Sequence, residues 1–319
     1  MKAQEKRQKI FKKFATNLKE YLDYHGLWAV TKLQNGYKKI EKDIYICPLC
    51  KSFFYQEAVF HYNNCQPLLT LEHNPPANIG GSASILTCSS CNNSNGSKID
   101  KVINTYIRTE DFIKGKDGAK IKTRSKIGDY YFGGELELNS KKHNTLFFDK
   151  ASNEYGFSNL LEKFKTGEIR TINFEFKLAD QNVLNLSLLK IAHLTAFKYL
   201  GYSYLLNHSG YKVIQILNGL LKHPNKNCGV MGFDFSDENI GLSVIKKPQE
   251  LRSLLVVQKV EVLNKRKNVG VIIPAPDEEG FNSLANFDKY INSEVHFNFI
   301  KYSFKNFPSI AETYYNMFR

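Results

Sequence analysis

Two pairs of cysteines, each with the spacing C-x2-C, constrain this 319-residue chain more than any other feature of its sequence. The first pair is Cys47 and Cys50, the second is Cys88 and Cys91, and residues 51–87 separate them. Each C-x2-C places two thiolates on one tight turn, and two such turns supply the four soft ligands that tetrahedral zinc prefers. The spacing therefore predicts a zinc site that fastens a long loop.

Polar residues with catalytic chemistry lie inside this loop and just after it. Glu72 and His73 follow a short leucine-rich run, and Asn92 directly follows the last cysteine of the second pair. A zinc-bound loop would bring this acid, imidazole and amide together. His61 and Cys65 have helical i, i+4 spacing and offer a second interpretation as metal ligands, although the two C-x2-C pairs already complete one tetrahedron.

The chain is strongly basic, with a net charge of +13 and a pI near 9.2. An excess of positive charge favours a polyanionic partner, with nucleic acid as the leading candidate. The same excess could also do no more than keep the protein soluble. Residues 1–20 carry seven Lys or Arg against two acids on an amphipathic pattern. This segment is either an arm that contacts phosphates or an ordinary solvated helix face.

The composition is that of a soluble globular protein, with 42% hydrophobic and 24% charged residues. No apolar run approaches the roughly 18 residues that cross a bilayer, and the N-terminal sequence has no apolar signal-peptide region. Six cysteines in a cytosolic chain favour metal binding over disulfides. We therefore expect a cytoplasmic protein with no membrane partner.

The pattern of apolar residues predicts an α+β protein. It indicates an amphipathic helix over 2–24, a short strand over 44–46, a helix over 97–108 and a buried helix over 184–206. Strands are expected over 136–138, 146–148, 172–178, 254–263, 269–273 and 295–304, and a short helix after Pro308. We expect a basic helix at 1–33, a zinc-bound domain at 34–118 and a mixed α+β domain at 119–319, because glycines punctuate the region around residue 120.

The cysteines, the Glu-His pair and the final Cys-Asn together resemble the HNH endonucleases, also called ββα-metal or His-Me finger nucleases. The resemblance is to the zinc-bound branch that includes phage endonuclease VII, and to bacterial members whose motifs read EHNPP and CNN-x-x-G-x-x-ID. It covers residues 44–110, about a fifth of the chain. Glu72 stands where the family usually has Asp, and Ala83 stands where a middle Asn is usual.

The resemblance implies a role for each matched residue. His73 would be the general base, and Glu72 and Asn92 would hold one catalytic Mg²⁺ or Mn²⁺, for which their oxygen ligands are suited. The zinc on the four cysteines would be structural, because four thiolates leave it no open position. Lys98, Lys101 and Arg108 would contact flanking phosphates, although solvated side chains explain them equally well.

These inferences lead to one main hypothesis and two alternatives. The first is a Mg²⁺-dependent HNH endonuclease that hydrolyses phosphodiester bonds in DNA, with a role in restriction or anti-phage defence suggested by analogy. Its C-terminal domain would recognise the target, sense a trigger or mediate assembly, homo-oligomerisation included. The alternatives are a non-catalytic, zinc-dependent nucleic-acid-binding protein and a toxin-like effector that cleaves RNA.

Overall fold

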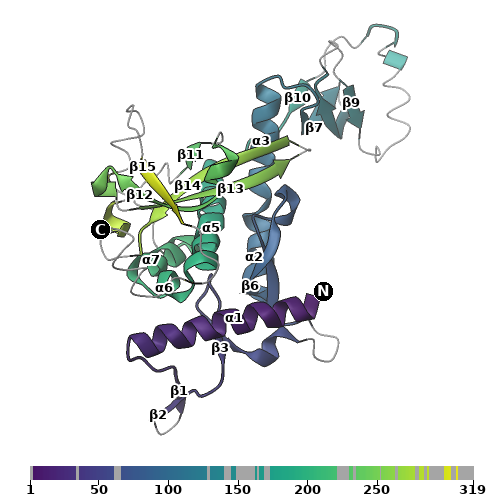
Figure 1. Cartoon of the computed structure of the whole chain (residues 1–319). Coiled ribbons are helices and arrows are strands. Elements are labelled where there is room, and N and C mark those ends of the chain that lie inside the picture. The colour runs from purple at the N-terminus through teal and green to yellow at the C-terminus, as the bar shows by residue number, and fades with distance from the viewer. Residues whose placement is uncertain are drawn as a thin grey trace. The chain divides into compact units, whose positions relative to one another are not determined.

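The computed structural model in Figure 1 describes most of the chain. The described residues are 3–33, 36–60, 66–127, 130–139, 145–148, 162–163, 165–168, 173–220, 230–232, 235–251, 253–262, 265–276, 280–283, 286, 298–302 and 307. The protein is a mixture of helices and sheets, as the α+β prediction requires. No helix within these ranges combines the length and apolar character needed to span a bilayer.

The contacts divide the chain into two compact units. One unit contains Met1–Asp100 together with Asn185–Arg319, and the other contains Lys101–Leu184. This division differs from the boundaries expected after residues 33 and 118. The first 100 residues share their unit with the last third of the chain, and residues 101–184 form an insertion between these two parts.

The N-terminal part of the first unit consists of one long helix and small antiparallel hairpins. In chain order the elements are α1 (Ala3–Tyr24), β1 (Val30–Leu33), β2 (Gly36–Lys39), β3 (Ile44–Ile46), β4 (Phe53–Tyr55), the short helix η1 (Gln56–Val59), β5 (Leu69–Asn74), η2 (Ala77–Ile79), β6 (Ser82–Cys88) and α2 (Ser89–Lys98). Strand β1 pairs with β2, β3 with β4, and β5 with β6, all antiparallel. The order β5, β6, α2 is therefore a hairpin that leads directly into a helix.

The described C-terminal part of the first unit combines helices with a five-stranded antiparallel sheet. Its elements are α5 (Gln181–Leu200), α6 (Tyr202–Leu205), α7 (His208–Leu217), β11 (Val230–Gly232), η3 (Asp237–Asn239), β12 (Gly241–Lys247), η4 (Gln249–Leu251), β13 (Ser253–Val262), β14 (Lys265–Pro274), α8 (Gly280–Ser283) and β15 (Asn298–Tyr302). The strand order is β11-β14-β13-β12-β15. Figure 1 shows α5 beside this sheet, and Gln258 of β13 donates to Thr195 of α5 at 2.8 Å.

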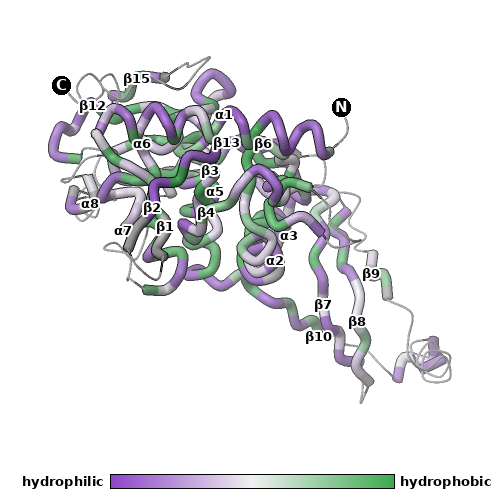
Figure 2. The backbone as a smooth tube through the Cα atoms, turned by 90° about the horizontal axis from the view of Figure 1, so that it is seen from below, coloured by the Kyte–Doolittle hydropathy of each residue, from purple (hydrophilic) through white to green (hydrophobic). Residues whose placement is uncertain are grey.

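Aromatic side chains join the two parts of the first unit in one core. Phe14 of α1 stacks on Phe197 of α5 with ring centroids 4.5 Å apart, and both rings lie near the fully buried Tyr45 of β3. The hydroxyl of Tyr202 accepts from the Ile46 amide at 2.8 Å. In Figure 2 the tube of α1 is hydrophilic over most of its length, interrupted by hydrophobic residues, which agrees with the predicted amphipathic helix.

The second unit is built on helix α3 (Lys101–Ile113) and a four-stranded antiparallel sheet. Its strands are β7 (Lys120–Ile127), β8 (Tyr130–Glu137), β9 (Thr145–Phe148) and β10 (Asn173–Glu175), in the order β10-β7-β8-β9. Buried and exposed residues alternate along β7 from Ile121 to Lys126, as in a sheet with one covered face.

Several elements match the expectations from sequence and others differ. The helix over 2–24 and the strands near residues 44–46, 254–263 and 269–273 are confirmed. Where a half-buried strand was expected over 172–178, the described residues 173–178 contain only the short β10, whose three residues are all on the exposed side of the fold. The predicted helix over 97–108 is two helices, because the Asn95 carbonyl accepts from the amides of both Ile99 and Asp100 and ends α2. The helix expected after Pro308 lies outside the described residues.

Candidate metal centre and adjoining polar site

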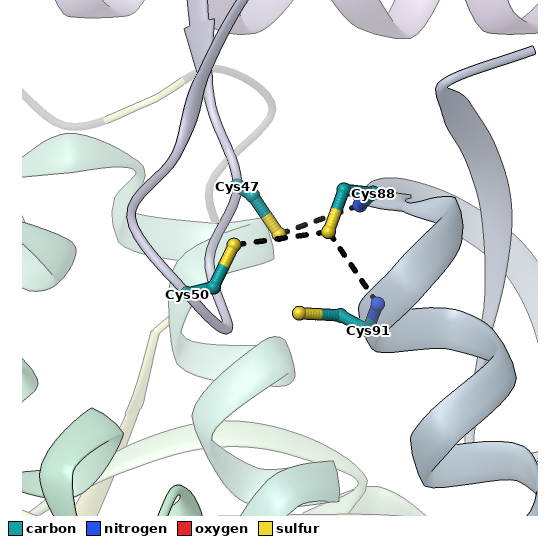
Figure 3. A group of neighbouring side chains, drawn as sticks. All are labelled: Cys47, Cys50, Cys88 and Cys91. Carbon is teal, nitrogen blue, oxygen red and sulfur yellow. Dashed lines mark hydrogen bonds between the residues drawn. The ribbon is translucent and has the colours of Figure 1, made fainter.

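The four paired cysteines come together from two turns of the first unit, as Figure 3 shows. Cys47 and Cys50 lie in the turn after β3, whereas Cys88 ends β6 and Cys91 lies in the first turn of α2. All four Sγ atoms lie within 4.8 Å of one another. This arrangement can hold a metal ion such as zinc.

The spacing of the sulfurs fits a tetrahedral ion. A regular tetrahedron with Zn–S bonds of about 2.3 Å has S···S edges of about 3.8 Å. The Cys50 and Cys88 sulfurs, one from each turn, are 3.7 Å apart. His61 and Cys65, the other ligands considered from sequence, lie outside the described residues.

Backbone amides hold the cysteine sulfurs in place. The Cys88 amide donates to the Cys47 sulfur, and the Cys91 amide donates to the Cys88 sulfur, each at 3.4 Å. Lys51 has φ of 65°, a left-handed conformation that turns the chain after the first pair, and its amide donates to the Cys47 carbonyl at 2.9 Å. Both turns are thus built by main-chain contacts as well as by the sulfurs.

Hydrogen bonds among the four thiols lower the pKa of some cysteines and raise the pKa of others. The contact between Cys47 and Cys50 lowers the pKa of Cys50 and raises the pKa of Cys47 well above its usual value. Hydrogen bonding with Cys47 also lowers the pKa of Cys88 to about 7. A metal ion that binds the thiolates would displace the protons that the cluster still holds.

The β5–β6 hairpin presents His73 on its exterior. His73 is exposed and pairs across the hairpin with Ala83, next to an irregularity in the register between Glu72 and His73. The turn is tight, because a Cβ at Gly81 would lie 1.4 Å from the Pro75 carbonyl oxygen. Only glycine fits at this position, so Gly81 fixes the path of the chain between the two strands.

Glu72 has the opposite environment, although it is the neighbour of His73. Its side chain is only 2% exposed, and its Oε1 forms a 2.8 Å ion pair with Lys190 of α5. Its Oε2 accepts from the Thr87 hydroxyl at 3.0 Å. Lys190 also donates to both oxygens of Asp100, at 2.9 and 3.0 Å.

Asn92 is tied to the strand that carries Glu72 and His73. Its Nδ2 donates to the Thr70 hydroxyl at 2.9 Å and to the Leu71 carbonyl at 3.3 Å. Helix α2 is thereby fastened to β5 by the residue that directly follows Cys91. With the amide nitrogen directed at the strand, Oδ1 is the atom of Asn92 that can serve as a ligand.

The residues predicted to contact nucleic acid have different environments. Lys98 ends α2 and is exposed, and Lys101 begins α3 in the other unit and is also exposed. Arg108 of α3 is partly buried and forms an ion pair with Glu135 of β8 at 3.2 Å. Two of the three side chains therefore lie exposed, whereas Arg108 already has an acidic partner.

Sequence reasoning missed Lys190, Asp100 and Thr87 as neighbours of the site. Lys190 is a single charged residue in the apolar run NLSLLKIAHLTAF, and lysine is almost never fully buried unless it is paired. That signal indicates a buried acidic partner for Lys190. It does not identify Glu72, from which Lys190 is far removed in the sequence.

Compared with models of protein families, with curated proteins and with solved structures, the chain matches none. The residues and geometry of the site itself are therefore the basis for inferring a function.

Proposed function

We propose that this protein is a divalent-metal-dependent endonuclease that hydrolyses phosphodiester bonds in DNA, with zinc on the four cysteines as a structural ion. The observation that carries the proposal is the placement of His73. It is an exposed imidazole at the end of β5, in a hairpin that continues into α2 and that the cysteine cluster closes. Asn92 of α2 is bonded to the same strand.

His73 would act as the general base. Histidine has an ordinary pKa near 6.5, so at neutral pH an imidazole can accept a proton from a water molecule that attacks phosphorus. Exposure at the edge of the hairpin gives a long polyanionic substrate access to the ring. The Gly81 turn and the Asn92 contacts would hold the strand rigid while the proton moves.

The side-chain oxygens of Glu72 and Asn92 are suitable ligands for a magnesium or manganese ion. Each carboxylate oxygen carries two lone pairs, and the contacts of Glu72 with Lys190 and Thr87 use one on each oxygen. Carboxylates that bind metals are commonly held by such neighbours. When bound, the ion would stabilise the negative charge that develops on the phosphate.

A zinc ion on the four cysteines would support this arrangement without taking part in the reaction. Four thiolates would fill the coordination sphere of the ion and leave no place for water or substrate. Its contribution would be to hold the turn after β3 against the start of α2. The exposed Lys98 of α2 would then add a favourable contact with phosphate, and the exposed Lys101 of the second unit offers a further positive charge to a polyanion.

One observation favours the alternative of a non-catalytic nucleic-acid-binding protein. The Glu72 carboxylate is buried and paired, as expected of a residue that serves only the fold. A binding protein would keep the basic charge and the cysteine cluster and would not need His73.

A nicking assay on supercoiled plasmid tests the proposal. We expect the wild type to cut only with Mg²⁺ or Mn²⁺, and His73→Ala to lose cutting while it retains metal on the cysteines and affinity for DNA. His208→Ala is the matched control, because His208 is an exposed histidine at the start of α7. Equal cutting by wild type and His73→Ala would reject the proposal, and DNA binding without cutting by either would favour the alternative. A parallel assay with RNA as the substrate tests the second alternative, because cleavage of RNA instead of DNA would support a toxin-like effector.

A further inference from the structure

A buried lysine from the C-terminal part of the chain reaches the acid of the candidate site. Lys190 lies near the middle of α5, and its side chain is 2% exposed. Its Nζ lies 2.8 Å from Oε1 of Glu72 and 2.9 Å from Oδ1 of Asp100. The Asp100 side chain is 13% exposed, so the cluster approaches the surface only on that side.

The composition of this cluster implies a specific arrangement. Burial of a charged group is costly unless opposite charge and hydrogen bonds compensate for the lost hydration. The Lys190 ammonium group pairs with the carboxylates of both Glu72 and Asp100, and the Thr87 hydroxyl donates to the other oxygen of Glu72. The side chain of Glu72 is therefore held at both oxygens, and Lys190 determines where Oε1 lies.

Other contacts bring the same helix onto the same elements. Nδ2 of Asn74, the last residue of β5, donates to the Ile191 carbonyl at 3.1 Å and to the Thr195 hydroxyl at 2.8 Å. Nε2 of His193 lies 2.8 Å from the carbonyl oxygen of Pro48, between the first two cysteines. Successive turns of α5 thus contact the end of the candidate strand and the first cysteine turn.

We propose that Lys190 is a positioning residue of the candidate catalytic centre and that α5 completes this centre. The proposal rests on the proposed function, because it assigns Glu72 a role beyond the fold. Lys190 and Thr87 orient the carboxylate for a divalent cation in the way that neighbours of a metal ligand do. The C-terminal part of the chain then supplies a component of the catalytic unit, in addition to any role in recognition or assembly.

The first test compares Lys190→Met with the wild type in the full-length protein. Met keeps the length and apolar character of the side chain and removes the charge. We expect the Mn²⁺ concentration for half-maximal nicking to rise about 10- to 100-fold, the effect typical of losing a neighbour of a metal ligand, and kcat to fall while KM for DNA stays constant. Direct titration with Mn²⁺, followed by electron paramagnetic resonance, should show the same loss of affinity. Lys198→Met on the same helix is the matched control and should leave both quantities unchanged.

The second test separates a positioning role from a purely structural one. Lys190→Met alone leaves the buried Glu72 carboxylate with the Thr87 hydroxyl but without an opposite charge, and it should lower the melting temperature. Adding Glu72→Gln to the same chain should recover part of the loss. The absence of this recovery would show that the two side chains do not interact and would overturn the proposal. Recovery together with Mn²⁺ affinity unchanged in Lys190→Met would also overturn it, because Lys190 would then serve only the fold.

The two proposals can fail separately. If the wild type binds Mn²⁺ through Glu72 and Lys190→Met weakens that binding, but no nucleic acid is cut, the positioning role stands and the nuclease proposal fails. If the wild type cuts DNA and Lys190→Met cuts it with the same metal dependence, the nuclease proposal stands and the positioning role fails.

Discussion

At the scale of single residues, two neighbours in the sequence have opposite environments. Glu72 is buried and paired with Lys190, whereas His73 is exposed on the same strand. Their types and order suggested a shared role in metal and proton chemistry, and the structure gives them different physical tasks. An ion pair fixes the acid, while the imidazole remains open to solvent.

His193 makes the stability of the fold depend on pH. Burial lowers its pKa from 6.5 to about 4, and the hydrogen bond with the Pro48 carbonyl opposes this effect. As the pH falls below 6.5, the unfolded chain takes up a proton that the folded chain does not accept until about pH 4, so the free energy of unfolding decreases over this window. Between pH 7 and pH 5 we expect a loss of about 2 kcal/mol from this residue.

The measurement is denaturant unfolding of the wild type and His193→Gln at both pH values. Glutamine retains an N–H donor for Pro48 and does not titrate, so its unfolding free energy should decrease less. Equal decreases in the two proteins would show that His193 is not the group responsible. Because both proteins carry the same cysteines, any loss of metal at low pH affects them equally.

At the scale of elements, the sequence predicted best where contacts are local. The C-x2-C spacing placed the sulfurs correctly, because each pair forms within one turn, and the four Sγ atoms do converge. Strand β4 was missed because its Phe-Phe-Tyr run shows no alternation of apolar and polar residues. The break between α2 and α3 was missed because the apolar periodicity continues across it. The ion pair of Glu72 with Lys190 was not predictable from pattern, because it depends on how α5 packs on β5.

Helix α2 offers a sharp test of the metal cluster. Cys88 is both a cluster cysteine and the N-cap residue of α2, since its sulfur accepts from the Cys91 amide. Cys88→Ser keeps a good N-cap side chain and removes one thiolate. Structural zinc in a four-ligand site contributes about 10–16 kcal/mol of apparent binding energy, so we expect loss of bound zinc and of the cooperative thermal transition.

The readouts are metal content by mass spectrometry and thermal denaturation followed by circular dichroism. Ser90→Ala, an exposed change in the same turn of α2, is the control and should retain about one zinc per chain. A Cys88→Ser protein that melts like the wild type would reject a structural role for the cluster.

At the scale of the whole molecule, the first unit is discontinuous in sequence. Its core combines Phe14 and Tyr45 with Phe197 and Tyr202, and residues 101–184 belong to the second unit. Composition placed a boundary near residue 120 because glycines gather there, but composition does not report which distant segments pack together. The mixed helix and sheet content was predictable from local pattern, whereas this interleaving was not.

Deletion of the inserted second unit should leave the first unit able to fold. Asp100 contacts Lys190, so the two points of attachment lie close together within the first unit. A chain in which a Gly/Ser linker of about eight residues replaces residues 101–180 should fold, bind zinc and melt cooperatively. By contrast, residues 1–184 alone should lack a stable core. Both outcomes can be measured by thermal denaturation, and a cooperative transition in residues 1–184 alone would contradict the shared core.

The discontinuity also sets an order of events during synthesis. Asn74 and its partner Ile191 are 117 residues apart. At about 5–20 residues per second, the ribosome needs about 6–23 s to pass from one to the other. The hairpin with Glu72 and His73 therefore emerges well before the helix that anchors it, and a nascent chain carries an incomplete site. A protein that cuts DNA would thus acquire its activity only after most of its length has been translated.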